Sequence, residues 1–80
     1  MFSINKIYTD FTGKRFLCDC VFGSEKAAKY AEASFLLPVR QYFGFADLYT
    51  KGNRLVLDTP NRQKTIELAL MLNESIKNMK

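Results

Sequence analysis

The chain has 80 residues, of which 48% are hydrophobic and 14% aromatic, so it can form one compact core and is not a disordered chain. Lysine and arginine number 12 against 8 acidic residues, for a net charge of +4, but no basic run exceeds a pair, which excludes a polybasic arm. The longest apolar stretches are too short to span a bilayer. We therefore expect one domain, 1–80, that is cytoplasmic and does not associate with membranes.

The first predicted elements are two strands joined by a turn. Segment 2–9 is rich in β-branched and aromatic residues, and residues 10–14 contain the Asp, Thr and Gly that turns favour. Segment 15–22 alternates between two faces. The face expected to point inward carries Phe16, Cys18, Cys20 and Phe22, and the outer face carries Arg15, Leu17, Asp19 and Val21.

A helix follows the second strand. Ser24 is a favoured N-cap, and an alanine-rich segment comes after it. Because the residue before a proline is disfavoured in a helix, Pro38 predicts an end near Leu37 and an irregular, apolar connector over 38–45. The expected buried stripe comprises Ala27, Ala28, Ala31 and Phe35, with Tyr30 as a further candidate.

The second half of the chain repeats this order. Segments 45–50 and 54–58 flank Gly52-Asn53, a pair typical of hairpin turns. Asp58 or Thr59 is expected to cap a final helix with Pro60 in its first turn. The buried stripe of that helix, within 63–79, should contain Thr65, Leu68, Ala69, Leu72, Ile76 and Met79. The sequence thus predicts an α+β two-layer sandwich in ββαββα order, with a four-stranded antiparallel sheet and both helices on one face.

The two predicted hairpins share a residue pattern. Tyr8, Thr9, Gly13, Arg15 and Asp19 correspond to Tyr49, Thr50, Gly52, Arg54 and Asp58, and the first loop is two residues longer. An internal duplication of halves 1–37 and 45–80 would explain this pattern, and so would the residue preferences common to hairpins. If the repeat has a function, we expect it at the outward-facing Arg15 and Arg54.

Residue types argue against an enzyme. The chain has no histidine, the commonest general base and metal ligand. Cys18 and Cys20 are expected to be inert buried thiols, and structural zinc requires four nitrogen or sulfur ligands. We therefore predict no catalytic residue, no metal site and no cofactor.

Two binding hypotheses remain. The first is a small binding protein that regulates or inhibits a protein partner. Arg40, Tyr42 and Phe43 are of the types that form interface hot spots, although the aromatic rings could instead cover the end of the sheet. Met71 lies away from the buried stripe of its helix and extends this hypothesis.

The alternative hypothesis is nucleic-acid binding by two parallel basic hairpin tips. Lys14, Arg15, Lys51 and Arg54 would contact phosphates while Phe11 stacks on a base. Simple solvated turns would carry the same charges.

A further expectation concerns the sheet face opposite the helices. Apolar residues predicted there suggest a homodimer formed through this outer face. They are Phe2, Ile4, Leu17, Val21 and Val56, with the rings of Tyr8 and Tyr49.

Overall fold

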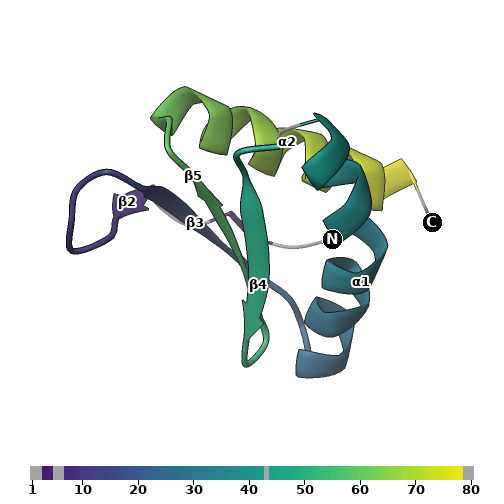
Figure 1. The fold of residues 1–80 in the computed structure, drawn as a ribbon. Helices are drawn as coiled ribbons and strands as arrows, with labels where there is room; N and C mark the ends of the chain where they lie inside the picture. The colour runs from purple at the N-terminus through teal and green to yellow at the C-terminus, as the bar shows by residue number, and fades with distance from the viewer. Residues whose placement is uncertain (1–2, 5–6, 43, 79–80) are drawn as a thin grey trace.

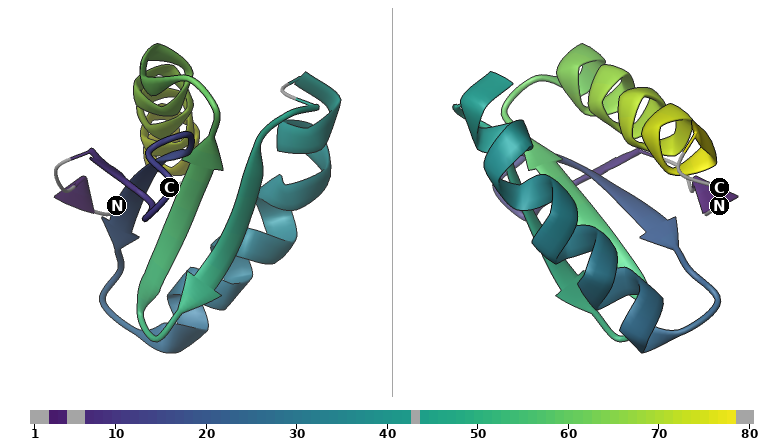
Figure 2. Two further views of the ribbon diagram at one scale, coloured as in Figure 1. Left: turned by 60° about the vertical axis from the view of Figure 1, so that its left-hand side comes forward. Right: turned by 90° about the vertical axis from the view of Figure 1, so that its right-hand side faces the viewer.

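The computed structural model describes residues 3–4, 7–42 and 44–78, with side chains over 7–41 and 44–75. It has the predicted α+β architecture, in which two helices cover one face of an antiparallel sheet (Figures 1 and 2). The elements are β1 (Ser3–Ile4), β2 (Tyr8–Thr9), β3 (Phe16–Val21), α1 (Glu25–Tyr42), β4 (Asp47–Lys51), β5 (Arg54–Thr59) and α2 (Arg62–Asn78).

The sheet has four strand positions, although its first strand is divided. The order across the sheet is β1, β3, β5, β4, and β2 pairs with the same edge of β3 as β1 does. The segment predicted as a single strand therefore forms two short ones, whose registers along β3 differ by one residue. The central pair, β3 and β5, is antiparallel over its whole length.

The core lies between the sheet and the helices. It contains side chains of β3 that the alternation of the sequence predicted to point inward. Cys18 and Cys20 are fully buried, and Phe22 is buried beside them. The other buried members of the cluster are Leu48, Leu55 and Leu57 from the sheet, Ala28, Ala31 and Val39 from α1, Ala46, and Leu68, Ala69 and Leu72 from α2. The core residues of α1 and of α2 recur with the period of a helix, so each helix presents one apolar stripe to the sheet.

Helix α1 is longer than the sequence predicted. Ser24 caps it as expected, since the Ala27 amide donates to the Ser24 hydroxyl at 3.1 Å. The helix then continues through Pro38 to Tyr42, so the predicted irregular connector is wrong. Val39 is buried in the core, and this burial favours helical continuation against the missing amide of Pro38. Tyr30 is mostly exposed and does not belong to the buried stripe.

The start of α2 also differs from prediction. Asn61, and neither Asp58 nor Thr59, caps the helix, because its side-chain oxygen accepts a hydrogen bond from the Lys64 amide at 3.1 Å. Pro60 precedes the helix. Buried Thr59 instead shares a 2.7 Å hydroxyl contact with Thr65 and contributes to the core beneath the first turn. Met79 and the side chain of Ile76 lie outside the described residues.

The hairpins β2–β3 and β4–β5 are related by a pseudo-two-fold axis. It passes through the Cys18–Leu57 pair at the centre of β3 and β5. Tyr8 pairs with Leu17 as Tyr49 pairs with Val56, so the registers place the two tyrosines in equivalent positions. Each helix packs partly over strands of the other half: α1 contacts β4 and β5, and α2 contacts β3 and β5. Over the ranges that the structure describes, no helix is long and apolar enough to cross a membrane.

Candidate functional site on the open sheet face

The face of the sheet opposite the helices is not covered by any described element (Figure 2). Strand alternation places ten side chains on it: Tyr8 from β2, Leu17, Asp19 and Val21 from β3, Asp47, Tyr49 and Lys51 from β4, and Arg54, Val56 and Asp58 from β5. Together with Arg15, which immediately precedes β3, these residues form what we call the open face.

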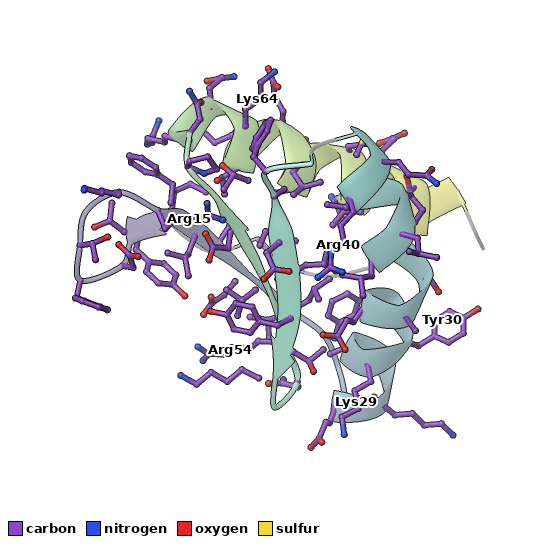
Figure 3. All side chains as sticks on the ribbon, in the orientation of Figure 1. Arg15, Lys29, Tyr30, Arg40, Arg54 and Lys64 are labelled. Carbon is purple, nitrogen blue, oxygen red and sulfur yellow. The ribbon has the colours of Figure 1, made fainter. Side chains whose placement is uncertain are left out.

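Two reciprocal ion pairs join the halves across the open face. Arg15 Nε lies 2.6 Å from Asp58 Oδ1, and Arg54 Nη1 lies 3.2 Å from Asp19 Oδ2. Each arginine therefore binds the aspartate of the other hairpin (Figure 3). Arg15 Nη2 also donates to the backbone carbonyls of Asp58 at 3.3 Å and Phe45 at 3.4 Å. The sequence placed an Arg and an Asp in each hairpin, but only the β3–β5 register decides which pairs form.

The tyrosines of the open face are held in their neutral form. The Tyr8 hydroxyl donates to Asp19 Oδ1 at 2.6 Å. Partial burial, followed by this hydrogen bond to a carboxylate, raises the pKa of Tyr8 well above its ordinary value. Partial burial also raises the pKa of Tyr49, and the nearby carboxylates of Asp58, Asp19 and Asp47 add to the shift. Both phenols therefore keep their proton at neutral pH, and that of Tyr8 is donated to Asp19.

A third ion pair closes the β4 edge of the face. Arg40 reaches from α1 to Asp47, with Nη2 3.5 Å from Oδ1. Asp47 and Asp58 lie directly opposite each other in the β4–β5 ladder, so two carboxylates are neighbours and each has its own arginine. The three arginines and three aspartates of these pairs balance in charge.

Beneath these polar groups the open face has an apolar floor. Leu17 and Val56 point away from the helices, yet they are only 7% and 2% exposed. Their cross-strand neighbours on this face are the tyrosines, with Tyr8 opposite Leu17 and Tyr49 opposite Val56.

The burial of Leu17 and Val56 removes two of the exposed apolar residues on which the expected homodimer depended. Ile4 pairs with Cys20, an inner-face position of β3, so its register does not match the predicted outer face. Phe2 and the side chain of Ile4 lie outside the described residues.

Of the predicted protein-binding residues, the structure describes the side chains of Arg40 and Met71. Arg40 belongs to α1 rather than to a connector and joins the open face through Asp47. Met71 is partly exposed on α2, in the helical layer. Tyr42 is the last residue of α1, but its side chain and the whole of Phe43 lie outside the described residues.

The predicted pair of parallel basic fingers is wrong in its geometry. Because β3 and β5 are antiparallel, the turn before β3 and the turn before β5 lie at opposite ends of the sheet. Five residue steps along β3, roughly 17 Å, separate those ends. Arg15 and Arg54 are also paired with aspartates. Lys14 and Lys51 are the other cations of the two turns, and both are exposed.

The described residues contain no group of three His, Cys, Asp or Glu placed to hold a metal ion. Cys18 and Cys20 are not joined in a disulfide. A side-chain hydrogen bond with Cys18, together with burial, raises the pKa of the Cys20 thiol and so disfavours a reactive thiolate. Comparisons of the chain with protein families, curated proteins and solved structures found no match.

Proposed function

We propose that the chain is a non-catalytic binding protein that regulates or inhibits a macromolecular protein partner, and that it binds this partner through the open face. The observation that carries the proposal is the combination of Tyr8 and Tyr49 with three arginines over a buried apolar floor. Tyrosine and arginine are the residue types that dominate the binding energy of protein interfaces.

The ion pairs support this function in a second way. A long arginine side chain loses conformational entropy when a partner immobilises it. Arg15 and Arg54 are already held by Asp58 and Asp19, so part of that cost is met in the unbound protein. Each arginine charge is also neutralised by its aspartate before a partner displaces water from the face. This favours a partner surface that is partly polar and partly apolar.

The test compares substitutions on the open face with matched exposed residues elsewhere. Tyr49→Ala and Arg40→Ala should each weaken binding to the partner by about 2 kcal/mol if these are hot spots. Tyr30→Ala is the control for the tyrosine, because Tyr30 points away from the body of the protein on α1 (Figure 3). Lys29→Ala is the control for the arginine, because Lys29 is also an exposed α1 cation in an ion pair, with Glu25.

A partner is first captured from the lysate of the producing cells after nuclease treatment and identified by mass spectrometry. Calorimetry with the purified partner then gives the affinity of each variant. Equal affinities for the open-face variants and the wild-type protein would move the interface elsewhere.

Nucleic-acid binding remains a second candidate because Phe11 and Lys14 are both exposed in one turn. A phosphate contact by several cations should weaken steeply as salt rises, unlike the contact proposed above. Fluorescence polarisation with a single-stranded oligonucleotide tests this candidate. The double substitution Lys14→Glu, Lys51→Glu should abolish any such binding. These lysines are chosen because replacing Arg15 or Arg54 would also break an ion pair with an aspartate.

A further inference from the structure

The β2–β3 loop carries a phenylalanine, Phe11, whose ring does not pack in the core. Phe11 is fully exposed, and the loop that carries it projects beyond the rest of the sheet (Figure 1). An exposed phenyl ring gains nothing from burial on folding, so the core does not explain its presence.

The pseudo-symmetric hairpin shows that the turn itself does not require this loop. Thr9 pairs with Phe16 as Thr50 pairs with Leu55, so both hairpins enter and leave their turns in the same register. Between these equivalent pairs the second hairpin has four residues, 51–54, whereas the first has six, 10–15. The longer loop therefore exceeds what strand pairing demands, and Phe11 lies within it.

Hydrogen bonds on both sides of Phe11 fix the loop without its ring. Asp10 Oδ1 accepts from the Thr12 amide at 3.1 Å and from the Thr12 hydroxyl at 2.6 Å, and Thr12 Oγ1 accepts from the Lys14 amide at 3.2 Å. Backbone bonds join Asp10 N to Arg15 O and Gly13 N to Asp10 O. Gly13 adopts a φ of 72°, which glycine tolerates best. The backbone at Phe11 is thus held in place before any partner arrives.

Two exposed cations lie at the same end of the sheet as Phe11. Lys14 is exposed in the same loop, and exposed Arg62 begins α2. The pairing of Phe16 with Thr59 places the loop and the start of α2 at the same end of the sheet. The one acidic residue of the loop, Asp10, turns its carboxylate toward Thr12.

We propose that Phe11 is a preorganised anchor that inserts into an apolar pocket of a folded protein partner, where Lys14 and Arg62 meet carboxylates at the rim. This inference rests on the proposed function and names the chemistry of its partner. A protein is favoured over a nucleic acid because Arg15 and Arg54 are already paired with aspartates, which leaves fewer cations at the hairpin turns to hold a phosphate chain. On a backbone that is already held, a phenylalanine has only its two side-chain torsions to fix when it enters a pocket.

The first test replaces the anchor in two ways. Phe11→Ala removes the ring, and a loop exchange replaces residues 10–14 with the Lys-Gly-Asn sequence of the second hairpin. Each change should weaken binding to the captured protein by about 30-fold while leaving the urea midpoint of unfolding unchanged. Tyr30→Ala is the control, because it removes another exposed ring on α1. Unchanged affinity in both loop variants overturns the anchor.

The second test identifies what the ring contacts. A photoreactive benzoylphenylalanine is placed at position 11, and in a matched protein at position 30, and each is irradiated in nuclease-treated lysate of the producing cells. We expect a discrete protein adduct from position 11 alone, linked to a peptide that lines an apolar pocket bordered by Asp or Glu. No adduct, the same adduct from both positions, or an adduct to nucleic acid in untreated lysate overturns the proposal.

The two proposals fail in distinguishable ways. If Tyr49→Ala weakens binding but both loop variants bind normally, the open face is the interface and the anchor is wrong. If the loop variants lose binding while Tyr49→Ala and Arg40→Ala do not, the anchor is supported and the open face is wrong. Normal binding by all four variants overturns both.

Discussion

At the scale of single residues, the two arginines of the open face occupy equivalent places but are not equally held. The Arg15–Asp58 pair is shorter, at 2.6 Å against 3.2 Å, and the Arg15 side chain is 33% exposed against 52% for Arg54. Arg15 also binds two backbone carbonyls, and Asp19 has Tyr8 as a second partner. Loss of Arg15 therefore leaves Asp58 without a charged partner among the described residues, whereas loss of Arg54 leaves Asp19 with its hydrogen bond from Tyr8.

We predict that Arg15→Gln lowers the free energy of unfolding by about 1–2 kcal/mol and that Arg54→Gln lowers it by at most about 0.5 kcal/mol. Urea denaturation of the two variants beside the wild-type protein measures both values. Each variant is the other's control, since the residues are equivalent under the pseudo-two-fold axis. An equal or reversed order would show that the ion pairs do not differ in the way their geometry indicates.

Ionisation of Tyr8 should make the free energy of unfolding depend on pH in the alkaline range. Burial and the Asp19 hydrogen bond raise its folded-state pKa above the ordinary 10.0, so the unfolded chain releases this proton first. Stability linked to Tyr8 is therefore complete below about pH 10 and is lost as the pH rises further. Tyr8→Phe should cost roughly 1 kcal/mol at neutral pH through the lost hydrogen bond, and should reduce the decline above pH 10. Urea midpoints between pH 7 and 11 measure both effects, and an unchanged alkaline decline contradicts the role given to Tyr8.

At the scale of elements, α1 shows how burial overrides a local signal. Pro38 has no amide to donate and crowds the preceding turn, which normally ends or kinks a helix. The chain nevertheless stays helical for four further residues, and Val39 is buried among the core residues beneath it. The proline is thus tolerated at a cost in stability.

Replacing that proline should recover part of the cost. Pro38→Ala restores a helical hydrogen bond and relieves the steric conflict, while the unfolded chain becomes more flexible, so we expect a net gain of about 1 kcal/mol in the free energy of unfolding. Far-ultraviolet circular dichroism during urea titration measures stability and helix content together. A loss of stability would show that the proline geometry itself is needed for the packing of Val39.

At the scale of the whole molecule, the pseudo-two-fold arrangement makes the two halves depend on each other. Their central strands pair with each other, and α1 covers strands of the second half. The ion pairs on the open face also cross between halves. Within one chain, each ββα half thus obtains from the other half the strand pairing and ion pairs that an isolated half would need a second copy to provide.

We therefore expect the isolated protein to be a monomer. Leu17 and Val56 are buried under paired charges, so the open face offers little apolar area to a second copy. Sedimentation equilibrium at tens of micromolar measures the mass, and Arg15→Gln provides a comparison in which the charged cover is weakened. A dimer of the wild-type protein would contradict this expectation and revive homodimerisation through the outer face.

Much of the fold could be predicted because it depends on local patterns. The alternation of β3, the Gly52-Asn53 turn and the Ser24 cap are each readable within a few residues, and the structure contains all three. The error over Pro38 arose because a proline signal is local, whereas the burial of Val39 depends on strands far along the chain. The candidate site was harder to predict, because Arg15 and Asp58 are 43 positions apart.

The sequence by itself determined the order of the elements, the inner faces of the strands and the presence of an outward Arg and Asp in each hairpin, because side-chain period and turn chemistry are local. Only the tertiary structure decided that the pairs are reciprocal, that the tips lie at opposite ends and that Leu17 and Val56 are covered. These features follow from the register of β3 against β5, which is set by the fit of the whole core.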